Sequence, residues 1–223
     1  VEDEARRLDF PPHDGRIEAA GSLKAPGRDP TIAQVTLHHD LASGTGGTAI
    51  AVPGIPFQVK GLQPEMLTPL TLGIVANVSG TVRGQGRIDW SPSGVTSSGT
   101  FNTDRIDLAA AFGPVTGLSG TIHFTDLLGL VSAPSQEARI ATINPGIEVA
   151  NGIVHYRLLG GNRIMVEDAR WPFAGGTLTL DPATLDFSQA SERRLTFQIT
   201  ALDAAAFIQQ LDFPNISATG TFD

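Results

Sequence analysis

The most informative pattern in the chain covers residues 70–90, where apolar and polar positions alternate. Every even-numbered position of this stretch is apolar or glycine, and eight of the ten odd-numbered positions are polar. Successive side chains of a β-strand point to opposite faces, so a period of two indicates extended structure with one apolar and one polar face. The stretch therefore predicts a two-faced β-strand.

The length of this stretch and its glycines predict a curved strand. Ordinary strands have about 5 or 6 residues, whereas this run would span roughly 70 Å if it were straight. Gly80, Gly84 and Gly86 fall on the apolar face, where a missing side chain lets the strand bend or another backbone approach. We expect strands that curl around a concave apolar surface. A hairpin turn near residues 79–80 is the alternative.

Other segments show the same two-faced pattern. Residues 118–124 and 195–199 alternate apolar with polar side chains. Residues 153–166 predict a hairpin with Gly160, Gly161 and Asn162 at its tip, because these residue types tolerate the positive φ of tight turns. The chain is therefore predicted to contain several strands with one polar, solvent-facing side and one apolar side.

The fold class that follows is mainly β, an elongated and strongly curved antiparallel sheet that forms an open apolar groove. One or two short helices accompany it. The best candidate is residues 203–211 with Asp203 as N-cap, and a second short turn is expected at residues 125–128. The 25 glycines and 15 prolines suit strands joined by turns. A closed β-sandwich, in which the apolar faces of two sheets pack together, is the alternative.

No stretch has the composition of a linker between domains, so residues 1–223 are interpreted as a single β-groove segment. Its last residues, 217–223, are strand-like, and we expect the chain to be a fragment of a longer protein. No run approaches 18 consecutive apolar residues, so a membrane anchor is expected outside this chain.

Charge and composition exclude several classes of partner and chemistry. The formal net charge is −8 and no segment clusters Lys or Arg with aromatic residues, which argues against nucleic acid and against adsorption to an anionic membrane. The chain has no cysteine, so it can form neither disulfides nor thiolate sites. Nucleic acid is therefore not expected as a partner.

Three groups of residues are candidates for a site of chemistry. Residues 44–49 match a dinucleotide fingerprint formally, but the helix that such a motif requires does not follow. His38, His39 and Asp40 are adjacent on a predicted strand and point to opposite faces, so they cannot converge on one metal ion. The acidic residues at 104, 107 and 126 have no group that orients them. We predict no enzyme activity, no catalytic residue, no metal and no cofactor.

The middle and C-terminal parts of the chain contain segments that resemble those of the YdbH-like proteins of Gram-negative bacteria, a family also labelled dicarboxylate transport domain. These segments are residues 107–115, 117–128, 143–147 and 171–176. The resemblance covers about residues 78–223 and leaves residues 1–60 unplaced. The dicarboxylate label has no support in the residues, because the 15 basic side chains are scattered and form no paired Arg clamp.

The resemblance implies membership of the AsmA-like group of bridge-type lipid-transfer proteins, which includes TamB relatives. Such proteins are anchored in the inner membrane by an N-terminal helix, cross the periplasm as a long β-groove and are implicated in moving phospholipid to the outer membrane. The expected location is therefore periplasmic, and the expected partner is phospholipid. An open sheet edge is also expected to accept a strand from an envelope protein or lipoprotein.

The expected function is binding and conduction of phospholipid acyl chains along the apolar face, because each buried methylene contributes about 0.8 kcal/mol. Alternatives are a structural or interaction scaffold in cell-envelope biogenesis and a carbohydrate-active β-fold. The residues predicted to line the lipid path are Leu70, Leu72, Ile74, Val78, Val82, Ile88, Trp90, Leu118, Ile122, Phe124, Leu178, Leu180, Leu195, Phe197 and Ile199.

Overall fold

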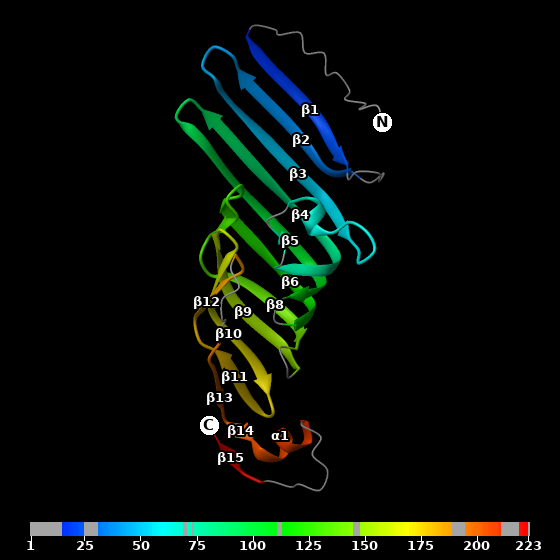
Figure 1. Cartoon of the computed structure of the whole chain (residues 1–223), viewed down its shortest axis with the longest axis vertical. Coiled ribbons are helices and arrows are strands. Elements are labelled where there is room, and N and C mark those ends of the chain that lie inside the picture. The colour runs from blue at the N-terminus through cyan, green and yellow to red at the C-terminus, as the bar shows by residue number, and fades with distance from the viewer. Residues whose placement is uncertain are drawn as a thin grey trace.

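The structure is a computed structural model that describes residues 15–24, 31–68, 71–72, 74–110, 113–144, 148–188, 195–210 and 219–222. Figure 1 shows one long, curved sheet whose strands run obliquely across its long axis. The strands β1 to β6 occupy one end of the sheet, and the α-helix lies at the other end near the C-terminus.

The strands of the large sheet vary greatly in length. They are β1 (Arg16–Lys24), β2 (Thr31–Asp40), β3 (Thr45–Phe57), β4 (Val75–Ser91), β5 (Gly94–Ala110), β6 (Gly113–Asp126), β7 (Val131–Ser132), β8 (Gln136–Ile143), β9 (Val149–Gly160), β10 (Arg163–Phe173), β11 (Gly176–Leu180), β12 (Ala183–Asp186) and β13 (Phe197–Thr200). Two shorter strands, β14 (Leu202–Asp203) and β15 (Thr221–Phe222), pair separately around the helix α1 (Ala204–Gln210).

The topology follows the chain. The 13-stranded sheet of the described residues has the order β1-β2-β3-β4-β5-β6-β7-β9-β10-β11-β13, with β8 paired to β6 and β9, and β12 paired to β10. Neighbouring strands are antiparallel throughout these pairs, so most connections are hairpins.

A row of β-bulges bends the sheet. The register shifts at positions 52–55 of β3, at 80–83 of β4 and at 103–106 of β5. These shifts lie side by side, because Ile55 pairs with Val82 of β4 and Gly80 of β4 pairs with Ile106 of β5. A bulge bends its strand and increases the local twist. Aligned bulges on adjacent strands therefore curve the sheet as a whole.

The predicted strand over residues 70–90 is confirmed only from Val75 onward, where β4 begins. Leu72 lies in a turn, and the Ile74 amide donates to the Thr71 carbonyl at 3.2 Å in the next turn, so the prediction of a strand is wrong there. Leu70 lies outside the described residues. The preceding connection forms turns and the 3₁₀ helix η1 (Pro64–Met66), in which short-range hydrogen bonds replace sheet pairing.

The alternative hairpin at residues 79–80 is wrong, because β4 continues through both positions. Gly80 has a φ of 141° and lies next to the Arg105 carbonyl of β5, so a side chain at this position would overlap the neighbouring backbone. The glycine thus permits a bulge with a close backbone approach rather than a chain reversal.

Two local predictions are confirmed. The tip between β9 and β10 has positive φ at Gly160, Gly161 and Asn162 (72°, 57° and 59°). The Ala206 amide donates to Asp203 Oδ1 at 2.7 Å, which caps the start of α1 as expected of an N-terminal aspartate. Residues 125–128 form the end of β6 and the turn that follows it.

The predicted fold class is confirmed, and the closed β-sandwich is wrong. In the part of the chain that the structure describes, one antiparallel sheet carries 13 strands and does not close into a barrel. The two-stranded sheet formed by β14 and β15 is too small to cover its apolar face. Side chains on that face must therefore bury one another through the curvature of a single sheet.

Candidate apolar groove

The strand register places apolar residues from successive strands on one face. Val52 of β3 pairs with Gly84 of β4, which pairs with Phe101 of β5, which pairs with Ile122 of β6. Directly paired residues of antiparallel strands project to the same face. The positions between them carry polar side chains, such as Gln85 opposite Thr100 and Thr100 opposite His123. The sheet therefore has a continuous apolar face and a continuous polar face.

Buried residues of the apolar face form two clusters. The N-terminal cluster consists of Ile32, Phe57, Leu62, Val78 and Ile106. The C-terminal cluster consists of Val115, Ile140, Ile143, Val149, Val166, Ala169, Trp171, Phe173, Leu180, Leu185 and Leu202. Leu108 of β5 packs against both clusters, so the two are joined rather than separate cores.

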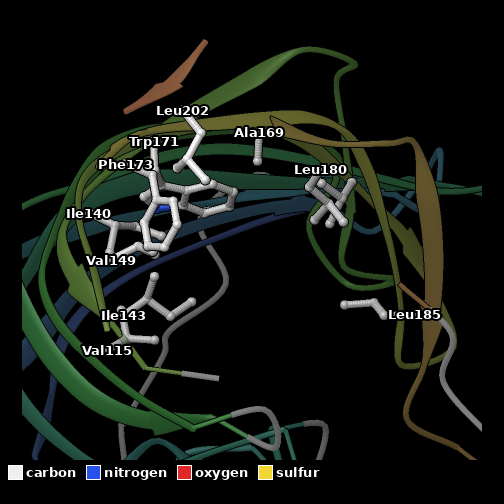
Figure 2. Packing of buried hydrophobic residues seen from close by; sticks show 11 residues of the cluster. Val115, Ile140, Ile143, Val149, Ala169, Trp171, Phe173, Leu180, Leu185 and Leu202 are labelled. Carbon is white, nitrogen blue, oxygen red and sulfur yellow. The ribbon is translucent and has the colours of Figure 1, made fainter. Parts of the chain in front are cut away.

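The C-terminal cluster surrounds a cavity of about 480 Å³. Figure 2 shows the cluster side chains projecting inward from strands that arch around them, with Ile140 and Val149 on one side and Leu180 and Leu185 on the other. The residues that line the cavity are Ile140, Ile143, Val149, Val154, Val166, Ala169, Trp171, Phe173, Leu178, Leu180, Leu185, Leu195, Phe197, Ile199 and Phe207. All of them are apolar or aromatic.

The helix α1 contributes to one side of this cavity. Phe207 packs edge-to-face on Phe173, with the ring centroids 6.1 Å apart. Leu202, just before the helix, is 2% exposed. Phe197 of β13 lines the cavity although it is 41% exposed, so this ring stands where the cavity meets solvent.

A smaller cavity of about 110 Å³ lies along the same face, towards β5 and β6. Its apolar lining includes Val82, Phe101, Leu118, Ile122 and Ala138, and Tyr156 of β9 also borders it. Leu118 packs against the C-terminal cluster as well, and Val82 against the N-terminal cluster. The smaller cavity therefore lies on the route that joins the two clusters.

Most residues predicted to line the apolar path lie on the apolar face. Leu178, Leu180, Leu195, Phe197 and Ile199 line the larger cavity, and Val82, Leu118 and Ile122 line the smaller one. Val78 is buried in the N-terminal cluster. Phe124 packs edge-to-face on Phe101, with centroids 5.9 Å apart.

The predicted residues near the other end of β4 have a different setting. Ile88 and Trp90 pair with Thr48 and Gly46, which places them on the apolar face but outside the two buried clusters. Leu72 is 58% exposed in its turn, and nothing places it with the other lining residues.

Sequence reasoning missed much of the larger cavity. The lining residues that it did not name are Ile140, Ile143, Val149, Val154, Val166, Ala169, Trp171, Phe173, Leu185 and Phe207. Alternation is visible at residues 169, 171 and 173, and this signal could have identified part of β10. The register shift at 166–168 breaks the pattern before that point.

Glycines provide space for aromatic rings on the apolar face. A Cβ at Gly46 would lie 2.5 Å from two carbons of the Trp90 indole, and a Cβ at Gly84 would lie 2.5 Å from the Phe101 ring. In each case the ring lies over a glycine on a neighbouring strand. Large rings can therefore lie flat along the sheet instead of projecting into the groove.

The glycine-rich segment at residues 44–49 and the segment His38–Asp40 have structural roles among the described residues. Gly44 lies in the turn before β3, with a φ of 67°. The Asp40 carboxylate accepts from the backbone and the hydroxyl of Ser43 at 2.8 and 2.9 Å, and these bonds lower its pKa below the usual value. Trp90 Nε1 donates to His39 Nδ1 at 3.1 Å, on the face opposite His38. No group of three potential metal-ligating side chains occurs in the described ranges.

The three acidic residues considered as catalytic candidates are not brought together. Asp104 pairs with Arg83 at 3.2 Å, and Asp107 accepts from the Gly117 amide at 2.7 Å. Asp126 accepts from Ser97 Oγ at 2.7 Å. Each carboxylate thus holds a local strand or turn contact, and the three have different partners.

Two larger hollows, of about 610 and 530 Å³, lie over β1 to β6. Their lining is mixed and includes Gln34, Thr36 and Arg87. Arg87 forms a two-pronged ion pair with Asp89 at 2.6 and 2.7 Å, which lowers the pKa of that carboxyl. Because the lining of these hollows is mixed and that of the C-terminal cavity is wholly apolar or aromatic, the C-terminal cavity is the better candidate site for an apolar ligand.

Comparison with protein families found one match. The model described as YdbH-like, intermembrane phospholipid transport protein YdbH, matches residues 4–223. The searches of curated proteins and of solved structures returned no match. Among the described residues, no helix is both long and apolar enough to cross a membrane.

Proposed function

Since the chain belongs to the YdbH-like family of intermembrane phospholipid transport proteins, we propose that its apolar groove holds the acyl chains of phospholipid while the polar head groups stay in water. This family transports lipid and is not a family of enzymes. The family match also extends over most of residues 1–60, the part that the earlier resemblance left unplaced.

The observation that carries this proposal is the lining of the larger cavity. Its 15 lining residues include no charged or hydrogen-bonding side chain except the Trp171 indole. Its volume of about 480 Å³ falls in the range of ordinary ligand pockets. Each methylene transferred from water to such a surface contributes about 0.8 kcal/mol. A hydrocarbon chain is the ligand that this lining favours.

Transport requires movement as well as binding, and the continuity of the apolar face supports it. Leu108 joins the two clusters, and the smaller cavity borders both Leu118 and Val82. Apolar contacts are non-directional, so an acyl chain finds similar contacts at successive positions along the face. We propose that the residues predicted from the sequence and placed on this face form part of the path.

An intermembrane carrier of a cell with two membranes works in the periplasm, which is the location that we propose. The edge strand β1 pairs with β2 on one side, and its other side has no partner among the described strands. An unpaired edge can accept a further strand. We therefore include a strand from an envelope protein or lipoprotein in the proposal.

The test is crosslinking of a phospholipid that carries a photoreactive group on its acyl chain, with native mass spectrometry of the purified protein. Phe197→Asp places a charge at the mouth of the larger cavity, at a position whose 41% exposure allows the chain to stay folded. Because an ion is poorly solvated beside an acyl chain, we expect crosslinking to fall strongly.

Thr200→Asp is the matched control, since Thr200 is an exposed residue of the same strand on the opposite face. It should crosslink as the wild type does. Absence of bound or crosslinked lipid in the wild type would refute the proposed function and favour a scaffold. Equal crosslinking of the two variants would show that lipid does not use this cavity.

A further inference from the structure

Tyr156 of β9 stands on the apolar face between the two cavities. Two residues earlier on the same strand, Val154 lines the larger cavity, and Tyr156 itself borders the smaller one. Two residues advance a strand by about 7 Å. Tyr156 also pairs with Val166, which belongs to the C-terminal cluster. The ring therefore lies at the junction of the two hollows.

The Tyr156 hydroxyl group has no hydrogen bond to any other residue that the structure describes. Gln136 of β8, the polar residue that pairs with Tyr156, already has other hydrogen-bond partners. Its Oε1 accepts from the His123 amide at 2.7 Å, and its Nε2 donates to the Pro134 carbonyl at 3.1 Å. The hydroxyl is thus a free donor beside the smaller cavity, whose lining combines apolar residues with Asn102, Thr103, Ser119 and Thr121.

The hydroxyl differs in two ways from the indole N–H of Trp171. Trp171 Nε1 is fully buried and unpaired among the described residues, whereas the Tyr156 oxygen is not among the fully buried unpaired atoms and stays accessible. Burial of the ring also raises the pKa of Tyr156 above its usual value of 10.0. The phenol therefore keeps its proton near neutral pH and can donate a hydrogen bond to an acceptor.

We propose that the Tyr156 hydroxyl donates a hydrogen bond to an ester carbonyl oxygen of the phospholipid in the groove, an inference that rests on the proposed function. With the acyl chain in the larger cavity, the ester is the first polar group met on leaving the hydrocarbon. A carbonyl accepts without donating, which complements a phenol. The phosphate is charged and remains in water, because its desolvation on an apolar wall is costly.

The experiment compares two phospholipids with the same head group and chain length, one with ester-linked and one with ether-linked chains. The ether lipid keeps the phosphate but lacks the carbonyl acceptor. Wild-type protein should bind the ester lipid more tightly, by roughly 2- to 12-fold, the range of a single net hydrogen bond. Tyr156→Phe removes the hydroxyl alone and should abolish this preference.

Two further measurements sharpen the test. Thr177→Val removes the hydroxyl of a half-buried residue that does not line either cavity and has no hydrogen bond to another described side chain, and it should leave both affinities unchanged. With a ¹³C-labelled ester, the carbonyl infrared band of the bound lipid should lie at lower frequency in the wild type than in Tyr156→Phe. A purely structural tyrosine would not move this band.

The outcomes separate this inference from the function on which it rests. Failure of the wild type to bind either lipid refutes the proposed function. Normal binding with the same ester preference in Tyr156→Phe overturns the inference and leaves the groove intact. An equal loss of both lipids in Tyr156→Phe also overturns it, because the acceptor would then belong to the head group.

Discussion

The indole ring of Trp171 on β10 lies directly against Gly152 on β9, where any side chain would overlap the indole Nε1. Trp171 is 4% exposed and belongs to the C-terminal cluster. The absence of a side chain at Gly152 lets the ring lie down on the neighbouring strand. This pair repeats the arrangement of Trp90 with Gly46 and of Phe101 with Gly84.

We predict that Gly152→Ala destabilises the chain and displaces Trp171. A methyl group that overlaps a packed ring costs about 1–3 kcal/mol, because the ring or the backbone must move. Urea unfolding measures the change in the free energy of unfolding. In a Trp90→Phe background, Trp171 is the remaining tryptophan, and its emission should shift to the red as the ring becomes more exposed.

Gly21→Ala is the control for this prediction. Gly21 also lies in a strand, but a Cβ there meets no atom within 4 Å. The alanine should be tolerated without loss of stability. If Gly152→Ala unfolded at the same urea concentration as Gly21→Ala, the indole would not depend on that glycine.

Gln63→Ala should destabilise the start of β4. The Gln63 side chain accepts from the Val78 amide at 2.8 Å and donates to the Val78 carbonyl at 2.8 Å and to the Gln58 carbonyl at 2.7 Å. The Gln63 side chain therefore makes the hydrogen bonds to Val78 that a neighbouring strand would otherwise make, at the register shift between Ala76 and Ser79. Leaving these backbone groups unpaired costs about 1–3 kcal/mol. Equilibrium unfolding and hydrogen exchange of the Val78 amide would measure the effect, and an unchanged exchange rate would contradict it.

The Ser97–Asp126 contact predicts a change of stability with pH. Hydrogen bonds from Ser97 Oγ and the Gly129 amide lower the pKa of Asp126 below its usual value of 3.8. A carboxyl whose pKa is lowered by folding stabilises the fold above the unfolded-state pKa and loses this contribution as the pH falls through the folded-state pKa. The contribution of Asp126 should therefore be complete above about pH 4 and decline below it.

Ser97→Ala tests this dependence. The difference in unfolding free energy between wild type and Ser97→Ala should shrink as the pH falls below 4. Ser93→Ala, which removes a hydroxyl bonded to Ser91 rather than to a carboxylate, should show no such trend. A difference between wild type and Ser97→Ala that stayed constant with pH would show that the Asp126 bond does not stabilise the fold.

Binding of single-chain phospholipids should depend on chain length and hardly on salt. Each added methylene should strengthen binding by up to about 0.8 kcal/mol while the larger cavity has room. No charged side chain lines this cavity, so added salt should screen few electrostatic interactions between the protein and the lipid. Isothermal titration with a chain-length series at two salt concentrations would test this. Affinity that followed salt and ignored chain length would indicate head-group binding instead.

The sequence predicted the parts of the sheet in which the pleat runs uninterrupted. From Gly84 to Trp90 the pairing of β4 is continuous on both sides, and a period of two follows because one face is apolar and the other meets water. The same period misled at Leu72 and Ile74, since alternation is also compatible with turns. Local patterns carry no information on which strands pair, and that pairing decides where curvature closes around a cavity.

The wall of the larger cavity shows the same limit. The bulge at 166–168 shifts the side-chain period of β10, so the apolar positions before and after it do not fall on one parity. The setting of Trp171 also requires Gly152 on another strand. The sequence places these residues 19 positions apart, and only the register of β9 with β10 brings them into contact.

Because the strands pair in chain order, the length of the sheet depends on the number of strands. Eleven strands follow one another along its main path, and at about 4.8 Å per strand they give a contour of roughly 50 Å. Because each strand contacts mainly its neighbours, stability is close to a sum of local interfaces, as in repeat proteins. Gain or loss of one hairpin would change the contour by about 10 Å and leave distant pairings intact. Evolution can therefore adjust the reach of such a protein in small steps, independently of the chemistry of its lining.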